Sequence, residues 1–337
     1  MLARVARSIL RAVTFAGFER HCAPVLNYHA CFRKLPPNVS PLDNITPDWL
    51  YQHLSALKRH FTLVSIDELS VSKRPRGIAA VTFDDGYKSV VEEALPIFVA
   101  LDVPFTMFIN ISSLERKIFW RHKVLYIQQH GLVQECETSL LRTKKVNGLD
   151  FYSYLKHPSN NSRVVEGEVD AFLQTKQLSI GQCDYLIDSP DCFVKHPLVW
   201  YGNHGHNHYV MSSLSYAEQV EEIASAKEYL HRQPGMQVSG VFSLPFGEAR
   251  HINRATFMAL QDSGYKALAM NRGLLNSRIA DKCGVRVIER FSPVGQPLEW
   301  QIKKRFAATL AGGRKDPALD RSPHALKGPW ARQRKQS

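Results

Sequence analysis

Two acidic residues directly follow an apolar run near residue 80. The run Ala79–Phe83 is typical of a strand covered on both faces, and Asp84, Asp85 and Gly86 come straight after it. In α/β sheets, chemistry gathers at the carboxyl ends of strands. Two neighbouring carboxylates there can have different roles, because one can bind a metal ion while the other acts as a base. The alternative is an ordinary Asp-Gly turn with solvated acids.

A cluster of histidines favours the chemical interpretation. His204, His206 and His208 fall within five residues, behind a second apolar run at residues 197–201. His204 and His208 are spaced i and i+4, so one helical turn would direct both imidazoles the same way. Two imidazoles and one carboxylate form a metal site that leaves positions open for water. Without the aspartate pair, such a cluster would more often be a solvated surface feature.

The two motifs together resemble those of the polysaccharide deacetylase family, the carbohydrate esterases with NodB homology. They are Thr-Phe-Asp-Asp-Gly-Tyr at residues 82–87 and Gly-Asn-His-Gly-His-Asn-His at residues 202–208, and the resemblance covers roughly residues 24–291. It implies an α/β fold, a distorted (β/α) barrel with fewer than eight regular units. It also implies hydrolysis of an N-acetyl group, or another acyl group, on a carbohydrate or glycoconjugate substrate.

The resemblance assigns a role to each residue of the two motifs. Asp85, His204 and His208 match the family's metal ligands, for which we predict one divalent ion, zinc. Asp84 matches the general base, which takes a proton from a metal-activated water as that water attacks. The ion also polarises the acetamide carbonyl.

Two further positions lie close to these motifs. Leu-Pro-Phe-Gly at residues 244–247 resembles the end of the family's third motif, which would make the Phe246 N–H a donor to the oxyanion. A simple turn made by the proline and the glycine is the alternative for the side chains. His206 is left open as an alternate ligand, a supporting residue or a residue without a role.

The chain departs from the family pattern in several places. Gly205 stands where the family has Ser or Thr, and Val241 stands where it has the arginine that steadies the base. Arg286 or Arg290 could replace that arginine. The family's Asp-x-x-Asp-Trp and late Leu-x-x-His motifs are not visible. These losses suggest an alternative function, a catalytically impaired protein that binds glycan or metal without turnover, although both aspartates are retained.

The missing late histidine leaves the general acid unassigned. An amide nitrogen leaves poorly unless it is protonated, so some group must supply a proton. His29 closes the first predicted strand, at the same kind of position as Asp84, and relatives that act on poly-N-acetylglucosamine resemble this chain in having an N-terminal Tyr-His. The alternative is a structural histidine at the end of a strand.

Alternating strands and helices would position these residues. That order implies parallel strands joined by right-handed crossovers. Residues 119–196 interrupt it with a polar, helix-favouring segment without a motif, which we interpret as an insertion beside the active-site face. The predicted strands are 25–29, 61–66, 79–83, 104–109, 197–201, 238–244, 266–270 and 285–288, and the predicted helices begin at Pro47, Lys88, Tyr216 and Asn253.

The net charge of +12 lies mostly at the two ends of the chain. Residues 1–20 hold four arginines against one glutamate, and residues 312–337 hold seven lysines and arginines against two aspartates. The body is only mildly basic, which argues against specific nucleic-acid binding. The basic ends suggest peripheral contact with a membrane surface through an amphipathic N-terminal helix, with a transit peptide or a docking helix as alternatives.

These observations divide the chain into three parts. We predict a basic amphipathic segment at 1–22, a catalytic domain at 23–306 and a disordered basic tail at 307–337. The six cysteines are scattered, and no secretory apolar region precedes them. We therefore expect reduced thiols and a cytoplasmic location. No stretch is long enough for a transmembrane helix.

Overall fold

The computed structural model describes residues 15–36, 39–115, 117–118, 120–140, 150–178 and 184–310. Most of the predicted N-terminal segment 1–22 and of the tail 307–337 lies outside these ranges. No helix within them is long and apolar enough to cross a membrane.

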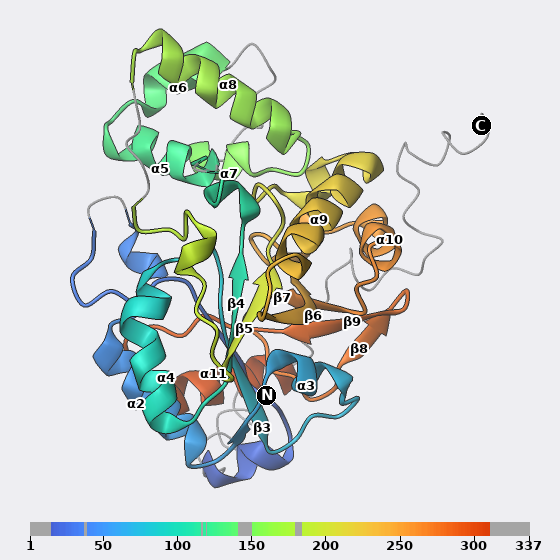
Figure 1. The fold of residues 1–337 in the computed structure, drawn as a ribbon. Coiled ribbons are helices and arrows are strands. Elements are labelled where there is room, and N and C mark those ends of the chain that lie inside the picture. Colours follow the sequence, from blue (N-terminus) through green and yellow to red (C-terminus); the bar gives the residue numbers. More distant parts are fainter. Residues whose placement is uncertain are drawn as a thin grey trace, which may run out of the picture.

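A curled, largely parallel sheet forms the centre of the molecule (Figure 1). Its strands run in the order β1-β3-β4-β5-β6-β7-β9-β8, and short β2 pairs with β3. Among the described strands, only the β8–β9 pairing is antiparallel. The central strands are apolar and buried, as expected for a sheet covered by helices. The strands are β1 (Val25–Tyr28), β2 (Thr62–Leu63), β3 (Ile78–Phe83), β4 (Phe105–Ile109), β5 (Val199–Asn203), β6 (Gln237–Ser243), β7 (Ala267–Met270), β8 (Ala280–Lys282) and β9 (Val285–Glu289).

The two ends of the parallel sheet meet. Phe291, just after β9, lies beside β1: its N–H donates to the Val25 carbonyl at 3.1 Å, and its carbonyl accepts from the Asn27 N–H at 2.9 Å. This contact closes the sheet into a distorted barrel of seven parallel strands among the described residues. The predicted fold is confirmed.

Helices and short helical turns connect the strands. The predicted starts at Pro47 and Tyr216 are confirmed: Thr46 caps the first helix, and Ser215 with Glu218 forms the capping box of the second. The α-helices are α2 (Pro47–Lys58), α3 (Ile66–Val71), α4 (Leu95–Leu101), α5 (Trp120–Gln129), α6 (Val133–Leu140), α7 (Phe151–Leu155), α8 (Ser162–Thr175), α9 (Tyr216–His231), α10 (Arg254–Asp262) and α11 (Leu298–Leu310). The 3₁₀ turns are Phe15–Arg20, Pro41–Asp43, Ile111–Ser113, Pro190–Cys192, Met211–Ser213 and Ala249–His251, and Val90–Ala94 is a π-helical turn.

The helices of the predicted insertion stand together at one end of the barrel. Figure 1 shows α5–α8 in green beyond the arrowhead of β4, which marks the carboxyl end of the strand. One apolar cluster joins them to the barrel, since Trp120 and Phe172 belong to the same cluster as Phe242 and Leu268. The insertion therefore shares a core with the barrel on the side where the strands end.

Two predicted elements differ from the structure, and two observed elements were not predicted. The predicted strand 61–66 is only the two residues of β2, because Ser65 caps a helix, α3, by accepting from the Glu68 N–H at 3.1 Å. The predicted helix from Lys88 to Leu101 begins with a π-helical turn, and α4 starts just before Pro96, which has no N–H to donate. Strand β8 and helix α11 were not predicted.

Strand β5 contains a glycine that faces a buried ring. A Cβ on Gly202 would lie 2.3 Å from Cδ1 of Phe108, a fully buried ring on the paired strand β4. We expect Gly202→Ala to lower the free energy of unfolding by about 1–3 kcal/mol, since the packed ring must shift. Gly167→Ala is the matched control: Gly167 lies in α8 with open space around it, so its replacement should be neutral or stabilise by up to about 1 kcal/mol. Urea unfolding of both variants checks this, and equal effects would contradict it.

Candidate metal and catalytic site

The candidate residues meet at the carboxyl ends of the parallel strands. Neighbouring parallel strands end at one edge, so residues that follow them become neighbours in space. The candidates are His29 after β1, Asp84 and Asp85 after β3, His204 after β5, Phe246 after β6 and Arg290 after β9.

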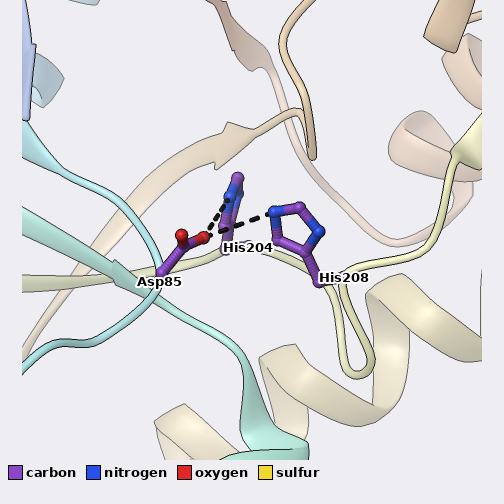
Figure 2. Close-up of side chains that lie close together, drawn as sticks. All are labelled: Asp85, His204 and His208. Carbon is purple, nitrogen blue, oxygen red and sulfur yellow. Dashed lines mark ion pairs between the residues drawn. The ribbon is translucent and has the colours of Figure 1, made fainter. Parts of the chain in front are cut away.

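Asp85, His204 and His208 form a compact set of metal-binding atoms. Figure 2 shows both imidazoles directed at one carboxylate oxygen: Asp85 Oδ1 lies 3.5 Å from His204 Nε2 and 3.3 Å from His208 Nε2. The three ligand atoms lie within 4.8 Å of one another, and all three residues are buried. Asp85 Oδ1 accepts no hydrogen bond from the described residues. This donor set fits a divalent ion with open positions.

A backbone carbonyl orients the imidazole of His204. Its Nδ1 lies 2.9 Å from the Ser243 carbonyl, which can only accept, so Nδ1 carries a proton and Nε2 is the atom left for a ligand. Burial alone would lower the pKa of His204, but Asp84 and Asp85 outweigh it and raise that pKa. A metal ion therefore competes with a proton for Nε2, and its binding should weaken as the pH falls.

The segment that carries the histidines is a loop, so the predicted helical turn is wrong. Gly205 has φ +81° and His208 has φ +60°, left-handed values that a helical turn does not contain. The loop is held instead by Asn207, whose N–H and side-chain amide both donate to Glu222 of α9, at 2.8 and 2.6 Å. The positive φ at residue 205 suits the glycine that stands there.

Backbone strain is concentrated at this site. Asp85 (φ +74°), His208 (φ +60°) and Phe246 (φ +63°) all adopt the left-handed conformation, which is uncommon outside glycine. Such residues cost on the order of 1–3 kcal/mol each and persist where the surroundings hold them. Their grouping here is typical of a functional site.

Of the two arginines predicted as replacements for the missing family arginine, Arg290 is the one that contacts Asp84. Its guanidinium donates to both oxygens of Asp84, Nη1 to Oδ1 and Nη2 to Oδ2, each at 2.9 Å, and both residues are buried. Burial would raise the pKa of Asp84, but Arg290 and then His204 overcome it and hold the pKa at about 2. Arg286, the other alternative, contacts the Ser70 carbonyl instead.

Asp84 is saturated with hydrogen-bond donors. Besides Arg290, Ser243 Oγ donates to Oδ1 at 3.0 Å and Asn27 Nδ2 donates to Oδ2 at 2.9 Å. A carboxylate offers about four lone-pair positions, so all of them have a donor. A proton taken up by Asp84 must displace one of these donors. The neutral groups of Ser243 and Asn27 can be displaced without leaving a buried charge unpaired.

Two contacts from the insertion were not predicted. Arg121 Nη1 donates to Asp85 Oδ2 at 2.6 Å, and Trp120 Nε1 donates to the His208 carbonyl at 3.2 Å. Burial would raise the pKa of Asp85, but Arg121 and the two histidines hold it well below its usual range. No sequence signal points to either contact, because α5 carries no motif.

The two remaining catalytic candidates also lie at the site. His29 is partly buried and comes one residue after Tyr28, which pairs with Phe83, so His29 and Asp84 leave adjacent strands together. The Phe246 ring packs 4.6 Å from the His208 ring, and its N–H donates to no described residue. Both positions suit the predicted roles, which stay predictions.

His206 points away from the metal ligands. Its Nε2 lies 3.2 Å from Glu115 Oε1, and its Nδ1 lies 3.1 Å from Ser225 Oγ. Of the roles left open for His206, that of an alternate ligand has no support in this arrangement.

Two buried histidines near the site predict acid sensitivity. Burial lowers the pKa of His122 and of His251 to about 3, from an ordinary 6.5. As the pH falls, these histidines take up a proton in the unfolded chain at a higher pH than in the folded protein. The free energy of unfolding should therefore fall as the pH drops from 6.5 towards 3, by up to about 1.4 kcal/mol per pH unit for each histidine. Urea unfolding between pH 7 and 4.5 should show a shallower decline for His251→Leu than for the wild type. Equal slopes would contradict the prediction.

Comparison with known proteins supports the sequence resemblance. Residues 72–153, which include both aspartates, match the family model described as polysaccharide deacetylase. No curated protein matches the chain significantly.

Several solved structures are similar to this chain. The deacetylase PplD from Streptococcus pyogenes, solved in complex with acetate, is 15% identical, with a TM-score of 0.50 over 85% of this chain and 98% of PplD. A de-N-acetylase from Aggregatibacter actinomycetemcomitans is 17% identical over 81% of this chain and 95% of its own, with a TM-score of 0.49. IcaB from Ammonifex degensii is 17% identical over 85% and 97%, with a TM-score of 0.47. At such low identity, the likeness to PplD shows a shared fold alone.

Proposed function

We propose that this chain, whose residues 72–153 match the polysaccharide deacetylase model, is a hydrolase of carbon–nitrogen bonds that removes acyl groups from an N-acetylated saccharide or glycoconjugate with one bound divalent metal ion. The observation that carries the proposal is the meeting of Asp85, His204 and His208 beside Asp84. In the reaction, a water oxygen adds to the acetamide carbonyl carbon, the carbon–nitrogen bond breaks, and acetate and a free amine leave.

The chain's own residues would divide this work. Asp85, His204 and His208 would hold the ion, which when bound supplies Lewis-acid polarisation and activates water. Asp84 would accept the proton of the attacking water. Arg290 keeps Asp84 ionised and fixes its orientation. The same contact lowers the basicity of Asp84, since a carboxylate with a pKa of about 2 is a weak proton acceptor.

Two residues would serve the later steps. The free N–H of Phe246 would donate to the oxyanion that forms on the substrate, beside the ring of His208. His29 would protonate the leaving nitrogen, from its place beside Asp84 at the strand ends. Undiminished activity in His29→Ala would remove His29 from this role.

The test is acetate release from a panel of N-acetylated oligosaccharides. Protein stripped with a chelator should be inactive, and reloading with zinc should restore equal amounts of acetate and free amine. Protein that binds zinc but releases no acetate from any member of the panel would favour the alternative, a catalytically impaired protein. The absence of the late histidine motif is the observation that favours this alternative.

A further inference from the structure

Arg121, in the first turn of the insertion helix α5, touches a metal ligand without belonging to any family motif. We infer that Arg121 is a positioning residue for the metal site and that it ties the position of the insertion, α5–α8, to metal binding. The inference rests on the proposed metal-dependent function.

Arg121 lies at the centre of a buried network. Its Nη1 donates to Asp85 Oδ2 and its Nη2 donates to Asp43 Oδ2, both at 2.6 Å, and the Tyr152 side chain lies close enough to feel its charge. The side chains of Arg121 and Asp43 are only 13% and 11% exposed, and that of Asp85 is fully buried. These partners come from three separate segments: the end of β3, the 3₁₀ turn before α2, and α7 of the insertion.

This network fixes how Asp85 can act. With Oδ2 held by Arg121, only Oδ1 remains to face His204 and His208. The carboxylate is thereby oriented to bind an ion through one oxygen before any ion is present. Metal binding therefore does not have to restrict the rotation of this side chain. The guanidinium also offsets the charge of Asp85, and Asp43 offsets the guanidinium in turn.

The residue next to Arg121 contacts a second ligand. Trp120 Nε1 donates to the carbonyl of His208, and the Trp120 ring packs against Phe246 at 5.7 Å. The first turn of α5 therefore touches two of the three metal ligands. Coupling between two binding events is reciprocal. If the docked α5 strengthens metal binding by a given free energy, a bound metal must stabilise the docked position of α5 by the same free energy.

Metal affinity tests the inference without measuring activity. We would measure zinc dissociation constants by chelator competition for the wild type, Arg121→Met, Arg121→Lys and Arg163→Met. Loss of a group that orients a metal ligand typically costs 10–100-fold in affinity, and we expect that loss in both Arg121 variants, because lysine cannot bridge two carboxylates as a guanidinium does. Arg163→Met is the matched control: Arg163 pairs with Glu221 and so joins insertion helix α8 to α9, away from the ligands.

Two further readouts separate positioning from general stability. In cobalt-substituted protein, the visible spectrum should change in the Arg121 variants and stay unchanged in Arg163→Met. Zinc should slow hydrogen exchange of residues 120–129 in the wild type and have less effect in Arg121→Lys. Thermal unfolding identifies any variant that fails to fold. If an Arg121 variant fails, Asp43→Asn replaces it, because this change removes the charge of one partner of Arg121 without touching Asp85. We expect it to weaken zinc binding several-fold.

The outcomes are distinct. Wild-type affinity or tighter binding in the folded Arg121 variants would overturn the inference, as would an equal loss in Arg163→Met. A wild-type protein that binds no zinc would instead overturn the proposed function, and the inference would fall with it.

Discussion

Replacing Asp84 by Asn should lower the rate of acetate release by about 10²–10⁴-fold, the usual contribution of a general base. Asparagine keeps the shape of the side chain but cannot take up the proton of the attacking water. The metal ligands Asp85, His204 and His208 are untouched, so zinc should remain bound. Kinetics and zinc content measured on the same preparation check both expectations.

Ser243→Ala is the control for this variant. It removes one neutral donor from Asp84 and leaves the carboxylate and Arg290 in place. We expect a smaller loss of rate than for Asp84→Asn, because the base itself is kept. Ser243 Oγ donates to the Asp84 carboxylate and accepts from Arg290, and a hydrogen bond to a charged group contributes about 1.5–3 kcal/mol. Asp84→Asn that keeps more than about a tenth of wild-type activity would rule out Asp84 as the base. Circular dichroism must show that the variant is folded, because it leaves Arg290 buried beside a neutral group.

Arg290→Met should lower the free energy of unfolding by about 3–5 kcal/mol at pH 7, the typical result of leaving one partner of a buried ion pair uncompensated. Without the guanidinium, burial dominates, and the pKa of Asp84 rises above its ordinary 3.8 instead of falling to about 2. A raised folded-state pKa means that the folded protein binds the proton more readily. The defect should therefore shrink as the pH drops through that raised pKa.

Arg286→Met is the matched control for Arg290→Met. Arg286 lies on the same strand, is only partly buried, and contacts a backbone carbonyl at 3.4 Å. We expect it to cost less than about 1 kcal/mol. Urea unfolding at pH 7 and pH 5 distinguishes the two positions. Equal losses, or a defect of Arg290→Met that grows in acid, would contradict our account of Asp84.

The sequence was sufficient to locate the residues that end strands. Asp84, Asp85 and His204 each follow an apolar run, and parallel strands bring such ends together, so their meeting could be predicted without coordinates. The spacing of His204 and His208 pointed to the right pair for the wrong reason. It matched a helical period, whereas a loop with a left-handed Gly205 brings the imidazoles together.

The residues that support the site could not be placed in this way. Arg290 could be named only as one of two alternatives, because it lies 206 positions from Asp84 and only closure of the barrel beside β1 brings the two together. Arg121 and Trp120 lie in a segment whose pattern indicates only a helix, and their contacts depend on how that helix packs over the strand ends. Charge pairs that depend on tertiary packing leave no periodic signal in a single sequence.

The most direct test of the central claim is the metal content of purified protein, measured by elemental mass spectrometry beside Asp85→Ala and His204→Ala. Our account predicts about one tightly held divalent ion per chain in the wild type and its loss in both variants, because each variant removes one of three ligands. An ion retained equally by all three proteins, or none in the wild type after zinc is offered, would contradict the account.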